Sequence, residues 1–218
     1  MDALGTLVEL VPPAPTLAVA LARAGFPQPD GSVDEAIAAE IAYYRAHMQR
    51  GRDAESLAEL RRDCARVLAA HLPEPRPPIP ELADLLVSSL VFRVHADAIP
   101  MLDALRMARV PVVVLSNWDC SLPGTLEDLG LAHYVELILT SAQIGSQKPE
   151  AEAFARAVEH FALDADQVLH VGDDAHRDAQ GAHSAGLRAV HLDRSGTGPG
   201  GPWTTVRSLL DVVPLAVA

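Results

Sequence analysis

The stretch Val168–Asp178 (VLHVGDDAHRD) joins an apolar run that is typical of a buried strand to a turn rich in carboxylates. Short apolar runs of the same kind occur at residues 110–115 (VPVVVL), 137–140 (LILT) and 189–192 (AVHL). Segments with helical periodicity lie around these runs, at residues 98–109, 122–129, 149–162, 175–185 and 203–212. Strands that are apolar on both faces and alternate with helices form parallel sheets that are covered on both sides. The sequence therefore predicts an α/β fold with a doubly wound parallel sheet.

Residues 11–95 follow a different pattern, because helical periodicity dominates there and no strand is evident. Asp34 and Asp53 are good residues to cap the N-termini of two amphipathic segments. The expected helices are residues 34–49, 53–71 and, after a proline-rich link, 81–91. We therefore expect an all-helical module at residues 11–95, inserted into a core that is formed by residues 1–10 and 96–218.

Composition and charge limit the classes of partner. The 218 residues carry a formal net charge of −12 at pH 7, which argues against nucleic acid or an acidic membrane. A metal and a few donors would still permit a small phosphorylated substrate. Two cysteines, Cys64 and Cys120, are too few for a disulfide framework and indicate a reducing compartment. Since no signal peptide and no apolar stretch of roughly 20 residues is evident, we expect a cytoplasmic protein without a membrane partner.

Polar side chains follow the predicted strands at their carboxyl ends, where ligands bind in open parallel sheets. His170 and His191 lie inside predicted strands, and we expect them to serve packing rather than catalysis. The candidates are Ser116 and Asn117 after residues 110–115, Lys148 after 137–140, Asp173, Asp174 and Asp178 after 168–171, and Asp2 and Thr6 before the helical module. Hydroxyls, an ammonium and carboxylates are thus expected to converge at one edge of the sheet.

Four segments in order along the chain have the character of known hydrolase motifs. They are DALGTL (2–7), LSNWD (115–119), GSQKP (145–149) and VGDDAHRD (171–178), and they resemble the four motifs of the haloacid dehalogenase-like hydrolase superfamily. The helical module between the first and second motifs resembles the subclass that contains many small phosphatases and the haloacid dehalogenases. The resemblance covers essentially the whole chain and implies a Rossmann-like core with an inserted helical cap.

The resemblance implies that Asp2 is the carboxylate nucleophile and forms an aspartyl-phosphate, which water then hydrolyses. It also implies Mg²⁺, held by Asp2, by the main-chain carbonyl of Leu4 and by Asp173, since hard oxygen ligands suit this ion. A carboxylate can attack an anionic substrate only if their charge repulsion is removed, and Mg²⁺ would do this.

The same resemblance implies supporting roles for the remaining candidates. Lys148 would act in catalysis by neutralising the charge of the transferring phosphoryl group. Asp174 would reach the metal through water, and Asp178 would orient Lys148. The residues expected to bind the phosphate are Thr6, Ser116, Asn117 and Lys148.

Two features depart from the superfamily's phosphatases. Those enzymes carry a second aspartate two residues after the nucleophile as general acid and base, whereas this chain has Leu4. Such a group contributes about 10²–10⁴ in rate, so we expect a slow phosphatase, a substrate with a good leaving group, or an acid from the cap. An apolar strand also precedes the nucleophile in the family, whereas only Met1 precedes Asp2 here. We therefore expect either a true start site further upstream or an Asp2 that is weakly anchored in a poorly preorganised site.

The favoured interpretation is a Mg²⁺-dependent phosphatase that acts on a small phosphomonoester. A 2-haloacid dehalogenase is the alternative among enzymes, since halide leaves without protonation and the DALGT form resembles the dehalogenases. The VGDDAHRD segment favours the phosphatase, because the dehalogenases need no metal and lack such a paired-carboxylate motif. A further alternative is a catalytically weak member that binds a phosphorylated ligand or a protein partner.

Overall fold

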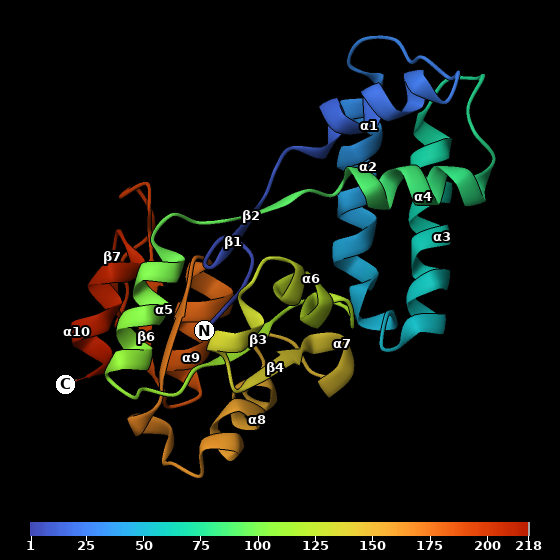
Figure 1. Ribbon diagram of the computed structural model, residues 1–218. Coiled ribbons are helices and arrows are strands. Elements are labelled where there is room, and N and C mark those ends of the chain that lie inside the picture. The colour runs from blue at the N-terminus through green and yellow to red at the C-terminus, as the bar shows by residue number, and fades with distance from the viewer. Residues whose placement is uncertain (218) are drawn as a thin grey trace. The chain divides into compact units, whose positions relative to one another are not determined.

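The computed structural model describes residues 1–217, and the chain divides into two compact units (Figure 1). One unit joins residues 1–9 to residues 93–218, and the other is formed by residues 10–92. Parallel strands alternate with helices in the first unit, whereas helices make up nearly all of the second. The α/β fold predicted from the sequence is confirmed.

The sheet of the first unit consists of two parallel groups of strands. In one group β3 (Val113–Ser116) pairs with β4 (Leu137–Thr140). In the other, β6 (Arg188–Leu192) pairs with β5 (Leu169–Gly172) on one side and with β7 (Thr204–Val206) on the other. All of these pairs are parallel, so the carboxyl ends of the strands point the same way within each group.

Met1 and Asp2 lie between the two groups and connect them. The Met1 carbonyl accepts a hydrogen bond from the Leu115 amide at 2.9 Å, and the Met1 α-amino group donates to the Val113 carbonyl at 2.6 Å. On the other side the Asp2 amide donates to the Val171 carbonyl at 2.9 Å. The expectation that Asp2 would be weakly anchored is therefore wrong, because main-chain bonds to β3 and β5 hold this short segment on both sides.

Helices of the first unit bury their apolar faces against the strands. Phe154 and Ala153 of α8 pack in a core with Leu115 of β3 and Ala182 of α9. The helices are α5 (Ala98–Met107), α6 (Leu122–Asp128), α7 (Ser141–Ile144), α8 (Ala151–Phe161), a π-helix (Ala175–Gln180), α9 (Gly181–Ser184) and α10 (Val213–Ala216). Short 3₁₀ turns lie at Ala132–Tyr134, Ala165–Gln167 and Leu209–Val212.

Two predicted elements of this unit need correction. The helix expected at residues 203–212 is wrong, because Thr204–Val206 forms β7 and only Leu209–Val212 makes a helical turn. The β-branched Thr-Thr-Val run favours an extended chain beside β6. The helix expected at residues 149–162 begins at Ala151, so Pro149 precedes it.

The second unit is a group of four α-helices: α1 (Pro13–Arg23), α2 (Ser32–His47), α3 (Ala54–His71) and α4 (Ile79–Ser89). Helix α2 packs against α3, which also contacts α4 (Figure 1). A 3₁₀ turn, Met48–Arg50, follows α2 on the way to α3. Asp53 caps α3, as predicted, because its side chain accepts a hydrogen bond from the Ser56 amide. Asp34 does not cap α2, which begins two residues earlier at Ser32.

The two chain segments that lead into and out of the helical unit pair with each other as β1 (Val8–Leu10) and β2 (Phe92–Val94). The expectation of no strand between residues 11 and 95 is therefore wrong for β2. Among the described residues, no helix combines the length and the apolar character that crossing a membrane requires.

Asp97, just before α5, connects two parts of the first unit, the start of α5 and the segment after β7. Its carboxylate accepts bonds from the Ser208 hydroxyl at 3.0 Å and the Leu209 amide at 2.9 Å, and also from Nη1 and Nη2 of Arg194. Burial alone would raise the pKa of Asp97, but the Arg194, Leu209 and Ser208 donors outweigh it and lower the pKa to about 2. The ionised form of Asp97 therefore stabilises the fold.

This arrangement predicts a pH-dependent stability difference. Asp97→Asn should lower the unfolding free energy at pH 7 by about 1–2 kcal/mol, since the group's pKa is lower in the folded chain than in the unfolded one. The stabilisation is present above the unfolded value of 3.8 and is lost as the pH falls towards 2. Urea unfolding of wild type, Asp97→Asn and the exposed control Asp128→Asn between pH 7 and pH 3 would measure it. A wild-type advantage that stays constant over this range would contradict the prediction.

Candidate active site

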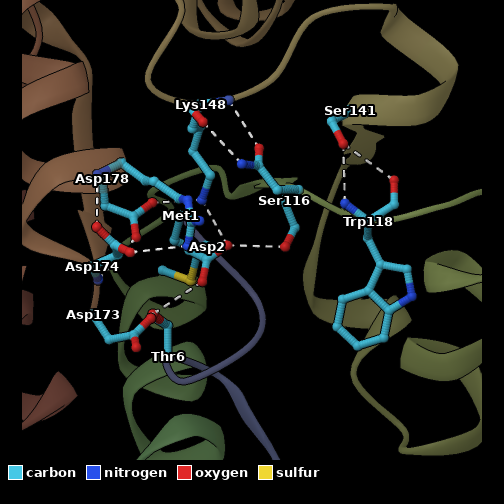
Figure 2. A network of polar contacts seen from close by, with 12 residues as sticks. Met1, Asp2, Thr6, Ser116, Trp118, Ser141, Lys148, Asp173, Asp174 and Asp178 are labelled. Atoms are coloured by element: carbon cyan, nitrogen blue, oxygen red, sulfur yellow. Dashed lines mark hydrogen bonds and ion pairs between the residues drawn. The ribbon is translucent and has the colours of Figure 1, made fainter. Parts of the chain in front are cut away.

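Asp2 is the centre of a buried polar network at the carboxyl ends of the central strands (Figure 2). Its Oδ1 atom accepts bonds from the Lys148 Nζ at 2.6 Å and from the Ser116 Oγ at 2.9 Å. The Thr6 hydroxyl lies 3.5 Å from Asp2 Oδ2 and 3.4 Å from Asp173 Oδ1. Lys148, Ser116 and Thr6, all singled out from the sequence, thus meet around the Asp2 carboxylate, and Asp173 lies next to them.

Lys148 is shared between two buried carboxylates. Its Nζ atom lies 2.6 Å from Asp2 Oδ1 and 2.5 Å from Asp178 Oδ1. Burial opposes the charge of Lys148, but Asp178 and Asp2 outweigh it and raise the pKa of the ammonium. Burial likewise opposes ionisation of Asp178, yet Lys148 and His170 hold its pKa well below the usual range. Lys148 and Asp178 therefore form a charged pair beside the candidate nucleophile.

One ammonium does not neutralise the whole cluster. Burial is the largest effect on Asp2 and raises its pKa in spite of Lys148. Asp173 lies at the more exposed rim, where partial burial and the charges of Asp2 and Asp178 raise its pKa to about 7. Carboxylate oxygens of Asp2, Asp173 and Asp178 lie within 4.8 Å of one another. These residues fit a hard divalent cation. Their oxygens would coordinate the cation, and its charge would keep the carboxylates ionised.

Asn117 acts on the main chain of Lys148. Its side-chain nitrogen donates to the Lys148 carbonyl at 2.9 Å, and its side-chain oxygen accepts from the Lys148 amide at 2.9 Å. Both ends of the Asn117 amide are thereby paired with one residue that lies 31 positions away in the sequence. The contact fixes the loop that carries Lys148, whereas the sequence pointed to Asn117 only as a phosphate ligand.

Asp174 and Leu4 are not members of the carboxylate cluster that Asp2, Asp173 and Asp178 form. The Asp174 carboxylate caps the π-helix by accepting from the His176 and Arg177 amides at 2.9 and 2.8 Å, and it pairs with the Arg177 side chain. Its contact with a metal through water stays a prediction. The Leu4 side chain is 37% exposed and places no polar group beside Asp2.

His170 is a site residue that sequence reasoning missed. Its Nε2 atom lies 2.9 Å from Asp178 Oδ1, and its ring packs edge-on against Phe154. Burial lowers the pKa of His170 to about 4, so the neutral ring donates Nε2–H to Asp178 at pH 7. His191 similarly contacts the Asp173 carbonyl at 3.2 Å through Nε2. The sequence offered a signal for each histidine. His170 lies inside an otherwise apolar strand just before the carboxylate motif, and His191 lies inside the apolar strand that pairs with it.

Gly5 allows Asp173 to approach the loop that follows Asp2. Its φ is +82°, a conformation that favours glycine. A Cβ atom on Gly5 would lie 2.2 Å from Asp173 Oδ2. No side chain can occupy that space, so the position of Asp173 depends on this glycine.

Comparison with known proteins agrees with this geometry. A sequence model described as haloacid dehalogenase-like hydrolase matches residues 1–186. The chain belongs to this hydrolase family. The match includes all four motifs and the helical unit, and it ends before β6.

Several curated relatives of this haloacid dehalogenase-like chain are phosphatases. Ribulose-1,5-bisphosphate 5-phosphatase of Halopiger xanaduensis is 32% identical over 134 residues, which are 60% of this chain and 56% of that protein. Phosphoserine phosphatase of Thermus thermophilus is 40% identical over 65 residues, which are 30% of this chain and 26% of that protein. The matched segments thus span about half or less of these relatives.

Solved structures of this family share the fold over nearly the full chain. An HAD phosphatase from Thermococcus onnurineus has a TM-score of 0.68 at 20% identity and covers 98% of this chain and 94% of its own. L-2-haloacid dehalogenase from Xanthobacter autotrophicus has a TM-score of 0.69 at 21% identity, with 98% and 95% covered. Because both chemistries occur on this fold, the fold alone does not separate them.

The close approach at Gly5 yields a prediction. Gly5→Ala should displace the Asp173 carboxylate and weaken Mg²⁺ binding by about 10–100-fold, as is typical when support for a metal ligand is lost. Gly130→Ala is the matched control, because Gly130 also has a positive φ but has open space at its Cβ position. Isothermal titration with Mg²⁺ would measure both variants. Equal Mg²⁺ affinity of Gly5→Ala and Gly130→Ala would show that the overlap with Asp173 is irrelevant.

Proposed function

We propose that this chain is a Mg²⁺-dependent phosphatase that acts on a small phosphomonoester through an aspartyl-phosphate on Asp2. The observation that carries the proposal is the Asp2 carboxylate, buried and contacted by Lys148 and Ser116, with two further carboxylates beside it. The phosphatase relatives support the reaction class. A dense carboxylate cluster suits metal-assisted chemistry on an anionic substrate better than it suits metal-free halide displacement.

The reaction would proceed in two displacements at phosphorus. An Asp2 carboxylate oxygen attacks phosphorus, the bond to the leaving oxygen breaks, and the alcohol departs with the electron pair of that bond and a proton from water. Water then attacks phosphorus of the aspartyl-phosphate, the bond to Asp2 breaks, and inorganic phosphate and the free carboxylate result. The Asp2 side chain is already fixed by Lys148 and Ser116, so little reorientation precedes the attack.

Mg²⁺ would be held by Asp2, by Asp173 and by the Leu4 main-chain carbonyl, and it would supply positive charge against the phosphate. Asp178 is a weaker candidate ligand, because its oxygens already accept bonds from Lys148, His170 and the Asp174 amide. Asp178 would instead hold Lys148 in its charged form.

The other residues would bind and orient the phosphate. Lys148 would neutralise the charge that develops on the phosphoryl oxygens, and the Ser116 hydroxyl would donate to one of them. Thr6 would brace the loop between Asp2 and Asp173. The helical unit would act as a cap that excludes water and selects the substrate.

The nucleophile assignment has a direct test. Asp2→Asn keeps the shape of the side chain but removes the attacking carboxylate, so turnover of phosphomonoesters should fall by about 10³-fold or more. Wild type, Asp2→Asn and the exposed control Asp128→Asn would be assayed with and without Mg²⁺. Unchanged activity of Asp2→Asn would refute the nucleophile. No turnover by wild type, combined with a thermal shift on binding phosphomonoesters, would favour a ligand-binding member of the family.

The presence of Leu4 leads to a prediction about which leaving groups react fastest. Because Leu4 supplies no proton, the rate should depend steeply on the pKa of the leaving alcohol, and aryl phosphates should react faster than alkyl phosphates. Leu4→Asp should raise kcat/KM for alkyl phosphates by about 10-fold or more and flatten this dependence. Leu4→Asn is the matched control, since it is polar but carries no acidic proton. If the rate depends equally steeply on the pKa of the leaving alcohol in wild type and in Leu4→Asp, the prediction is contradicted.

A 2-haloacid dehalogenase is the second candidate, and Leu4 is the observation that favours it, because halide leaves without a proton. Chloride release from a 2-chloro acid without added metal would establish this activity. Absence of chloride release, together with Mg²⁺-stimulated phosphate release, would exclude it.

A further inference from the structure

Arg194 lies outside the segment that the family match covers, yet it reaches the loop of the candidate nucleophile. It lies two residues after the end of β6, and the family match ends at residue 186. Its Nη2 atom donates to the main-chain carbonyl of Thr6 at 3.0 Å. The two residues lie 188 positions apart in the sequence, so only the folded first unit brings them together.

The Arg194 guanidinium is held in one orientation by Asp97. Nη1 contacts Asp97 Oδ2 at 2.8 Å and Nη2 contacts Asp97 Oδ1 at 3.0 Å, which is the two-pronged geometry of an arginine–carboxylate pair. Asp97 is itself held by the Ser208 hydroxyl and the Leu209 amide. The Nη2 atom that contacts Thr6 is therefore fixed in place rather than carried on a freely rotating side chain.

The base of the Arg194 side chain is also fixed. The Asp193 carboxylate accepts bonds from the Ser195 hydroxyl at 2.7 Å and from the Gly196 and Gly198 amides at 2.9 and 2.7 Å. The Asp193 amide donates to the Val206 carbonyl of β7. These bonds set the direction in which the chain leaves β6 and hence the position of Arg194.

The nucleophile loop, residues 3–8, runs into β1, which pairs with β2, and apart from this pairing it makes only a few hydrogen bonds to the rest of the unit. The Ala3 carbonyl accepts bonds from the amides of Thr6, Leu7 and Val8, which closes the loop on itself. Arg194 at the Thr6 carbonyl and the His95 amide at the Leu7 carbonyl connect it outward. The Thr6 hydroxyl lies between Asp2 and Asp173, so a shift of Thr6 would disturb both carboxylates.

We propose that Arg194, held by Asp97, is a positioning residue that clamps the nucleophile loop through the Thr6 carbonyl. The clamp makes the segment beyond residue 186 part of the active-site framework. Its effect on turnover rests on the proposed function, whereas its effect on the mobility of the loop does not. Arginine is required because a lysine ammonium cannot hold both Asp97 oxygens in a fork and still reach a third acceptor.

Hydrogen exchange tests the clamp without an activity assay. Arg194→Met keeps much of the apolar stem and removes the donors, so exchange in residues 3–8 should become about tenfold faster. Arg188→Met is the matched control, since Arg188 of β6 donates to the Leu215 carbonyl at 2.6 Å but does not contact the loop. Residues 3–8 should exchange at the wild-type rate in Arg188→Met. Unchanged exchange in Arg194→Met, or equal acceleration in both variants, would overturn the proposal.

Kinetics provide the second measurement. Arg194→Met should lower kcat by about tenfold and leave KM within about twofold, because the loop holds the attacking group more than it holds the substrate. Arg194→Lys should recover part of kcat, because its single ammonium nitrogen can still donate to the Thr6 carbonyl or to Asp97 but not to both Asp97 oxygens in a fork. A rise of KM alone would overturn the positioning role. Faster exchange in Arg194→Met together with an inactive wild type would support the clamp and refute only the phosphatase.

Discussion

The arrangement of three carboxylates around one buried ammonium is the constraint on which the active-site edge depends. Lys148 contacts Asp2 and Asp178, and Asp173 closes the group at the rim. Removing one partner of a buried ion pair typically costs about 3–5 kcal/mol, because the remaining charge is left uncompensated. Burial, together with the charges of the neighbouring carboxylates, raises the pKa values of Asp2 and Asp173, and the single ammonium does not offset this. A divalent cation would complete this balance.

Two glycines in the main chain around the cluster leave space that the carboxylates occupy. A Cβ atom on Gly5 would overlap Asp173, and one on Gly172 would lie 2.1 Å from the Asp178 Cγ. Each glycine therefore admits one carboxylate. Met1 and Asp2 extend the sheet between β3 and β5, so the candidate nucleophile stands on hydrogen-bonded main chain. Rigid support of this kind is what a preorganised nucleophile needs.

The sequence was sufficient for features that depend on local pattern. The apolar run 137–140 is β4 at the predicted boundaries, and Asp2, Ser116, Lys148 and Asp173 meet at the predicted edge because parallel strands end there together. Features that depend on distant partners were not predictable. Asn117 bonds the Lys148 main chain, His170 bonds Asp178, and Arg194 bonds Thr6, and none of these pairings follows from residue type alone. The anchoring of Asp2 was underestimated because two residues between strands give no apolar run to detect.

Trapping the covalent intermediate is the measurement that addresses the central claim most directly. The enzyme would be mixed with an aryl phosphate and Mg²⁺, quenched, and treated with borohydride, which reduces an acyl phosphate but leaves a free carboxylate intact. Tandem mass spectrometry would then locate the reduced residue. The account predicts reduction at Asp2 that depends on both substrate and Mg²⁺. Rapid turnover with the reduced residue at another carboxylate would contradict it.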